Sequence, residues 1–547
     1  MADLSGIALV GEGTPKELWT DRKAMTRSSA VVTLLSLATA GANFGLQIVI
    51  AYVFGAGAYV DTYFAATTVP LTLMTLVSGS ITAGLVPYFV SQRREQGERA
   101  LDRLISSLLV VCACGLATLV LMGIGFAPSI VRLTLPGFGP EDRKVVVQLF
   151  EILFIAVFFG GLNGLLVAAH NARGRFWVSA IAPFVGAVIA VCFLLLMSSS
   201  LGVYAIAWAT TVGTMAQTMI VSLAAKPVGA FALGARSAEL GKAFALVAPL
   251  IAAQVFGQSH QLIARFLGSS LERGAISALA YALRLVGVLQ VLTSSGLSVV
   301  GLPWLSSQAT DRGSLGNSLS RLVRLALVAF LPPAALLALL RVPIITVLFQ
   351  RGAFDSQAVT AASEALLYYS GILLLTVATG GLVSTFLYSL QRSGLVALLW
   401  SAEAVVNATL AAFLVRPLGF KGIALAFSLA HAFTLIAVLI CLKPLGIRLQ
   451  PGLGRFVGKV AAAIAISGLA ASESYRLLVS LCAGPAFHCV AGRLVGAVAV
   501  YALVYLWMLT LLRIPEVTLW RDILRRDMLV PAFDSLKRVG WLQHLLP

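Results

Sequence analysis

Charged residues are scarce in this sequence: Asp, Glu, Lys and Arg make up only 11% of its 547 residues, whereas hydrophobic residues make up 59%. A soluble globular protein carries about 25% charged side chains, because water must solvate its surface. The composition therefore excludes an ordinary soluble protein. It predicts that much of the surface faces lipid.

Signatures of common catalytic sites are also missing. The sequence has no Walker phosphate-binding loop, no His-Glu-x-x-His zinc motif and no Gly-x-Ser-x-Gly nucleophile elbow. We therefore expect a transporter rather than an enzyme, with no cofactor and no metal site. Without a nucleotide site, transport must be driven by the membrane potential, an ion gradient or the supply of substrate.

The sequence contains long stretches without charged residues. Residues 28–60 and 62–92 are two of them, separated only by Asp61, and about 20 apolar residues suffice for a helix to cross the bilayer. The same pattern predicts an all-α polytopic membrane protein with fourteen spans near 31–54, 63–89, 104–130, 146–170, 177–199, 203–225, 243–264, 283–305, 325–349, 365–390, 394–415, 422–442, 457–475 and 493–512.

Positive charge is distributed unevenly over the predicted loops. The two termini and the even-numbered loops hold about two thirds of the 39 Lys and Arg residues, far more than the odd-numbered loops. Because cytoplasmic loops are enriched in Lys and Arg, both termini of this multi-pass protein are predicted to be cytoplasmic. The net charge of +17 then reflects topology and anionic lipid, not nucleic acid.

Two short patterns recur at nearly one offset. Residues 84–92 (GLVPYFVSQ) resemble 300–308 (VGLPWLSSQ) at an offset of 216, and 168–173 (AAHNAR) resemble 388–392 (YSLQR) at an offset of 219. Two matches of this kind indicate a repeated bundle of six spans with parallel halves, so a substrate site is expected between the halves. The alternative is chance similarity between apolar helices.

The repeat divides the chain into five parts. We expect an N-terminal cytoplasmic tail (1–27), an N-lobe with spans one to six (28–230) and a C-lobe with spans seven to twelve (231–450). Two further spans (451–515) and a C-terminal cytoplasmic tail (516–547) follow.

Ionisable groups within spans are the first candidates for function, because a charge in the bilayer is costly. Arg284 begins the eighth span, where it either binds a pyrophosphate or extends to the interface. Asp61 follows the glycines 55 and 57 and either caps the second helix or pairs with Arg284 in a cavity.

Three glutamates and two cysteines complete the candidate residues. Glu151, Glu364 and Glu403 lie near span ends or in the cavity, and each either accepts a coupling proton or has a solvated or capping role. Cys482 and Cys489 share the loop between the last two spans, on the predicted periplasmic side. There they form a disulfide or remain two free thiols.

Several of these segments together resemble the MurJ (MviN) lipid II flippases of the multidrug/oligosaccharidyl-lipid/polysaccharide superfamily. The resemblance spans roughly residues 30–512 and rests on 54–57 (FGAG) with Asp61, 85–87 (LVP), Arg284-Leu285, 302–306 (LPWLS) and 348–354 (LFQRGAF). It implies a fold like that of the multidrug antiporters of this superfamily, with two six-helix lobes, a cationic cavity containing Asp61 and Arg284, and a groove for a polyprenyl tail along the last two helices.

The resemblance implies a flippase that moves a polyprenyl-pyrophosphate-linked saccharide, lipid II, from the cytoplasmic to the periplasmic leaflet of the bacterial inner membrane by alternating access. Its partners would be this lipid, the bilayer and enzymes of cell-envelope or polysaccharide synthesis. The chain departs from the family where Ala40, Leu46 and Met74 replace expected cavity arginines. Alternatives are a divergent exporter of an exopolysaccharide or O-antigen repeat unit, a cation-coupled drug antiporter, or a membrane scaffold without transport activity.

Overall fold

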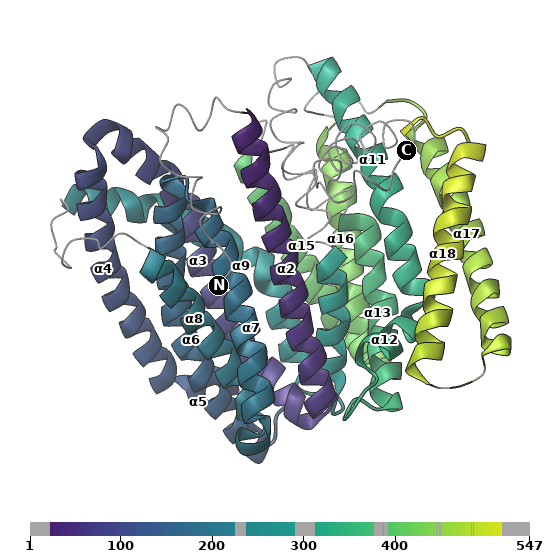
Figure 1. Cartoon of the computed structure of the whole chain (residues 1–547), viewed down its shortest axis with the longest axis horizontal. Coiled ribbons are helices and arrows are strands. Elements are labelled where there is room, and N and C mark those ends of the chain that lie inside the picture. Colours follow the sequence, from purple (N-terminus) through teal and green to yellow (C-terminus); the bar gives the residue numbers. More distant parts are fainter. Residues whose placement is uncertain are drawn as a thin grey trace, which may run out of the picture. The chain divides into compact units, whose positions relative to one another are not determined.

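The computed structural model is helical throughout the residues that it describes (Figure 1). These residues are 22–224, 237–289, 312–376, 387, 392–442, 444, 447, 450–482, 484 and 486–516. The all-α polytopic fold predicted from the sequence is confirmed: eleven of the described helices are long and apolar enough to cross a membrane.

The described helices follow one another along the chain. In chain order they are α2 (Arg22–Phe54), α3 (Ala58–Gln96), α4 (Glu98–Gly125), α5 (Ala127–Thr134), α6 (Pro140–Ala172), α7 (Phe176–Leu201), α8 (Tyr204–Ala224), α9 (Ser237–Gly268), the helix Ala275–Leu289, α11 (Arg312–Leu339), α12 (Arg341–Phe349), α13 (Ser356–Thr376), α15 (Ser393–Leu418), α16 (Phe420–Leu442), α17 (Leu453–Leu481) and α18 (Phe487–Leu511).

Eleven of the fourteen predicted spans coincide with these long apolar helices. The other three, 243–264, 283–305 and 365–390, fall on α9, the helix Ala275–Leu289 and α13. Parts of the eighth and tenth spans lie outside the described residues. The second copy of each repeat, 300–308 and 388–392, also lies outside them, except for Arg392.

The chain divides into two compact units. The first contains Met1–Arg284, Leu348–Ala365 and Trp400–Ala430, and the second contains Leu285–Val347, Leu366–Leu399 and His431–Pro547. The lobe boundaries expected from the repeat, 28–230 and 231–450, stay a prediction.

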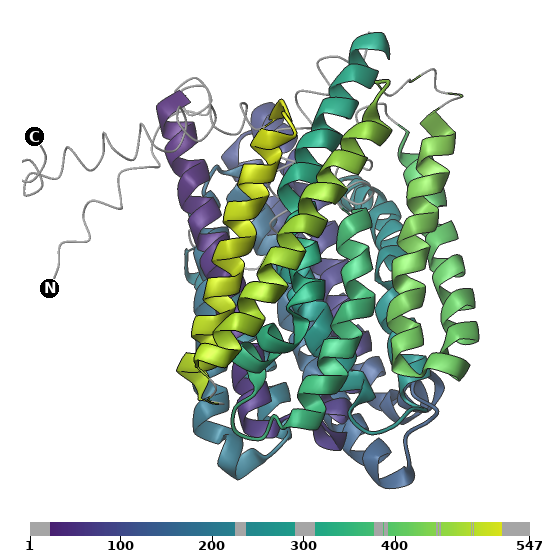
Figure 2. The same cartoon turned by 90° about the vertical axis from the view of Figure 1, so that its right-hand side faces the viewer.

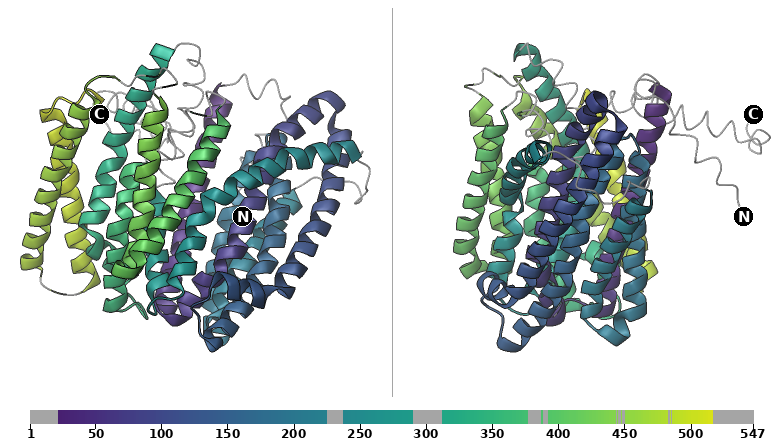
Figure 3. Two further views of the ribbon diagram at one scale, coloured as in Figure 1. Left: turned by 180° about the vertical axis from the view of Figure 1, so that it is seen from behind. Right: turned by 90° about the vertical axis from the view of Figure 1, so that its left-hand side faces the viewer.

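Helices of the first unit lie side by side (Figure 3), and small residues allow some of them to pack closely. A Cβ added to Gly164 of α6 would lie 2.7 Å from the Ser78 backbone of α3, and the Thr82 hydroxyl donates to the Gly164 carbonyl at 3.0 Å. Gly186 of α7 and Gly213 of α8 approach each other in the same way. Close backbone approach replaces the hydrophobic effect as a source of helix association in lipid.

In the second unit, α17 and α18 form an antiparallel hairpin that packs against α11 (Figure 2). Their shared core contains eight buried residues: Val328, Phe456, Val460, Ala463, Tyr505, Met508, Leu509 and Ile514. This packing places the last two helices beside α11.

Candidate functional site

Asp61 lies in the first turn of α3 and is only 5% exposed. Its Oδ2 accepts a hydrogen bond from the Gly274 N–H at 2.6 Å, and its Oδ1 accepts one from the Ser277 N–H at 2.7 Å. Both amides belong to the start of the helix Ala275–Leu289. Asp61 therefore caps a helix more than 200 residues further along the chain.

This result corrects the expectation that Asp61 caps α3 itself. The N-cap of α3 is Gly57, which has no side chain to accept a hydrogen bond. The first amides of a helix have no intrahelical partner and lie at the positive end of its dipole, so a carboxylate stabilises them from any part of the chain. Tertiary structure decides which helix Asp61 caps.

Tyr281, on the capped helix, fixes the turn between α2 and α3. Its side chain is fully buried and its hydroxyl donates to the Gly55 carbonyl at 3.0 Å. The ring packs edge-on against Phe64, with centroids 5.5 Å apart, and against Phe354 at 5.3 Å. These contacts bring the 54–57 and 348–354 segments together around one aromatic ring.

Gly352 permits the closest approach in this cluster. Its φ angle is +59°, and a Cβ at this position would lie 2.2 Å from the Tyr52 carbonyl oxygen. The next residue, Ala353, donates its N–H to the same oxygen at 2.9 Å. Only glycine combines this left-handed backbone with so little space.

Arg284 lies three residues beyond Tyr281 on the same helix, and its side chain is exposed. It is within electrostatic range of the Tyr63 hydroxyl, which in turn forms a hydrogen bond with Thr210 of α8 at 3.1 Å. Among the residues that the structure describes, the Arg284 guanidinium has no ion pair and no hydrogen bond. The direct Asp61–Arg284 pair considered from the sequence is not formed.

Arg265 is a cation near this site that the sequence analysis did not single out. It donates to the Ile276 carbonyl at 2.9 Å, its guanidinium carbon lies 5.7 Å from the centre of the Phe64 ring, and it interacts electrostatically with Asp61. Arg265 falls one residue past the predicted seventh span, so it was counted with a loop. The only signal in the sequence that could have identified Arg265 is its position at the end of a predicted span.

Glu364 and Glu151 have different surroundings. Glu364 of α13 forms an ion pair with Lys421 of α16 at 2.7 Å, and both side chains are partly exposed. Glu151 is half-buried on α6, and no ion pair or hydrogen bond of its side chain is seen among the described residues. Neither glutamate lies among the residues that surround Asp61.

Glu403 lines a cavity of about 80 Å³ within the first unit. The His260 ring stacks on Phe427, with centroids 4.4 Å apart and planes 11° apart. The cavity is lined by Gly257, Ser259, His260, Trp400, Glu403, Ala404, Asn407 and Phe427. It lies between helices that the composition assigns to the membrane, and charged and polar side chains form part of its lining.

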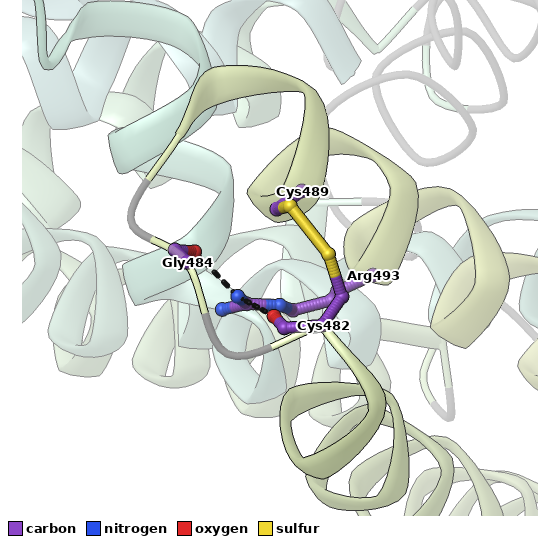
Figure 4. Close-up of a disulfide and its surroundings, with 4 residues drawn as sticks. All are labelled: Cys482, Gly484, Cys489 and Arg493. Carbon is purple, nitrogen blue, oxygen red and sulfur yellow. Dashed lines mark hydrogen bonds between the residues drawn. A yellow bond between two sulfur atoms is a disulfide. The ribbon is translucent and has the colours of Figure 1, made fainter.

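Cys482 and Cys489 form a disulfide between α17 and α18 (Figure 4). The buried guanidinium of Arg493 donates to the carbonyls of Cys482 and Gly484 in the same turn. A covalent bond and a charged cap thus fix the turn between the last two helices.

Comparison with known families gives one match that covers most of the chain. Residues 50–482 match the family model described as "Lipid II flippase MurJ". A lipid II flippase of Burkholderia cenocepacia is 27% identical over 457 residues, covering 80% of this chain and 87% of its own length. A probable lipid II flippase of Bdellovibrio bacteriovorus is 26% identical, covering 84% and 90%.

Solved structures with the same fold are also transport proteins by name. A lipid II flippase in an inward closed conformation superimposes with a TM-score of 0.74 at 18% identity, over 88% of this chain and 99% of its own. A multidrug-resistance transporter of the MATE family, facing inward, gives 0.64 at 14% identity, over 74% and 95%. At these identities, the structural likeness is one of fold.

Proposed function

We propose that this chain, which belongs to the lipid II flippase MurJ family, moves lipid II from the cytoplasmic to the periplasmic leaflet of the bacterial inner membrane. A relative with 27% identity is named a lipid II flippase. The long apolar helices are those of a multi-pass membrane protein. The distribution of Lys and Arg supports cytoplasmic termini. Alternating access by two lobes is the mechanism that we infer.

Arg284 is the observation that carries this proposal. A guanidinium within a predicted span that is exposed, and that forms no ion pair with the described residues, can bind an anionic ligand. Its planar donors match two oxygens of a pyrophosphate at once. The capped helix and the buried Tyr281 fix the backbone from which Arg284 extends.

The positions where the family resemblance implies further arginines have a packing role here. Leu46 is buried, and Met74 fills the space above Gly160 of α6, where a Cβ would lie 2.3 Å from its side chain. Fewer cations would bind the same pyrophosphate less tightly, since each charge-assisted hydrogen bond contributes about 1.5–3 kcal/mol. Arg284 should therefore carry a larger share of the binding.

Complementation tests the proposed substrate. Expression of the full chain in a bacterium depleted of its own lipid II flippase should restore growth and normal cell shape, whereas an empty vector should not. A membrane-localised chain that fails to rescue, but restores export in a strain lacking its exopolysaccharide or O-antigen flippase, would identify another lipid-linked glycan as the substrate.

We further propose that the cavity containing Glu403 couples transport to an ion gradient. Glu403 and Asn407 lie one turn apart on α15, and His260 faces them from α9. A carboxylate at membrane depth that lines a polar cavity is a common binding group for a proton or another cation. Neutralising it should separate coupling from substrate binding.

Replacing Glu403 with glutamine should reduce gradient-driven transport by about tenfold, because the substitution keeps the shape and removes the charge. The rate without a gradient should change little. The measurement is the accessibility of a lipid-linked substrate to an impermeant reagent in proteoliposomes with imposed pH or sodium gradients. Glu473→Gln, at an exposed site on α17, is the matched control; equal responses of the two variants would exclude coupling through Glu403.

A further inference from the structure

Two consecutive prolines interrupt α11. Pro332 and Pro333 lie within the helix Arg312–Leu339, and proline has no backbone N–H. The Val328 carbonyl would normally accept from residue 332, four positions later, so it loses its intrahelical donor. An unpaired carbonyl is costly in a span, where no water replaces the missing donor.

Two tyrosines of α18 donate hydrogen bonds to α11 at this break. The Tyr505 hydroxyl donates to the Val328 carbonyl at 3.0 Å, and the Tyr501 hydroxyl donates to the Pro332 carbonyl at 3.1 Å. Tyr501 and Tyr505 are one helical turn apart, as are residues 328 and 332, so the two hydroxyls match the two carbonyls in spacing. Both tyrosines are buried, at 4% and 7% exposure, and their rings are stacked.

Buried hydrophobic side chains shield these hydrogen bonds from water. Val328 and Tyr505 belong to the buried core shared by α11, α17 and α18. Beyond it, Arg324 of α11 lies 3.9 Å from the buried Glu516 and 5.3 Å from the centre of the Phe456 ring. Hydrogen bonds in such a medium are stronger than in water.

We infer that Tyr501 and Tyr505 are positioning residues whose hydrogen bonds brace α11 at its proline break, and we call this arrangement a splint. It makes α11 and the α17–α18 hairpin move as one body. Bending α11 at Pro332 requires the two hydroxyls to leave their carbonyls. The last two helices therefore have a mechanical role in addition to any contact with a lipid tail. This inference does not depend on which substrate is transported.

The test is amide hydrogen exchange of the full-length purified protein, followed by mass spectrometry over the peptides that contain residues 328–339. Tyr505→Phe should accelerate exchange there by about tenfold, because the Val328 carbonyl loses its donor. Tyr501→Phe should have a smaller effect, since the Pro332 carbonyl can still accept from the Leu336 N–H. Tyr475→Phe on α17 is the control and should match the wild type.

A second substitution distinguishes a splint from general packing. Pro332→Ala restores an N–H for the Val328 carbonyl, so Tyr505→Phe in that background should change exchange by less than about twofold. Equal exchange in Tyr505→Phe and Tyr475→Phe, or an undiminished effect of Tyr505→Phe beside Pro332→Ala, would overturn the inference. If Tyr505→Phe alone fails to accumulate, accumulation of the double variant supports the splint and its failure overturns it.

Discussion

Replacing Arg284 with alanine is expected to abolish transport while the protein stays in the membrane at its normal level. The guanidinium has no ion pair among the described residues, so its removal breaks none of the salt bridges seen there. It would remove two charge-assisted hydrogen bonds to the proposed pyrophosphate, and at about 1.5–3 kcal/mol each, their loss corresponds to a transport rate at least about 100-fold lower. Arg284→Lys should retain partial activity, because lysine keeps the charge but not the planar pair of donors.

The measurement is complementation together with the translocation rate in proteoliposomes, normalised to the amount of protein in the membrane. Arg476→Ala is the matched control, because Arg476 is exposed on α17 and, among the described residues, pairs with the neighbouring Glu473 alone. An Arg284→Ala variant with wild-type activity would contradict the site and leave the family assignment intact.

Asp61→Ala should cause the largest loss of stability among substitutions at the site. It removes both acceptors of the Gly274 and Ser277 amides and leaves these donors in a buried position. An unsatisfied buried donor costs about 1–3 kcal/mol, so we expect a loss of about 2–5 kcal/mol and strongly reduced accumulation. Asp61→Asn keeps an acceptor oxygen but places an amide donor against an N–H, and its effect should lie between those of wild type and alanine.

Asp355 provides an internal comparison. Its Oδ1 caps the start of α13 through the Ala358 N–H at 2.8 Å, within its own stretch of chain and at an exposed position. Asp355→Ala should cost about 1 kcal/mol, the usual value for an N-cap. Thermal unfolding of the purified variants compares the two losses of stability. Equal losses would show that the long-range cap stabilises the protein no more than an ordinary N-cap.

The positions of most spans could be predicted because lipid imposes a simple rule on sequence. Eleven predicted spans agree with long apolar helices, since each needs only length and an absence of charge. Span 243–264 was found by the same rule and falls on α9, although Gln254, Gln258, His260 and Gln261 lie within it.

Partners across the fold could not be predicted in the same way. Asp61 has an ordinary capping pattern, yet its amides come from residues 274 and 277. The Lys421 partner of Glu364 and the carbonyl partners of Tyr501 and Tyr505 are likewise set by packing between helices distant in sequence. Local sequence identifies the groups that need a partner, but the three-dimensional arrangement decides which partner they find.

The cap formed by Asp61 also has a consequence for biosynthesis. The carboxylate and the Gly274 amide are 213 residues apart, so the ribosome completes α3 long before the amide exists. Until the later segment leaves the translocon, this acid must stay hydrated or protonated near the membrane boundary. The first turn of α3 can settle into its final place only after a helix synthesised many seconds later has arrived.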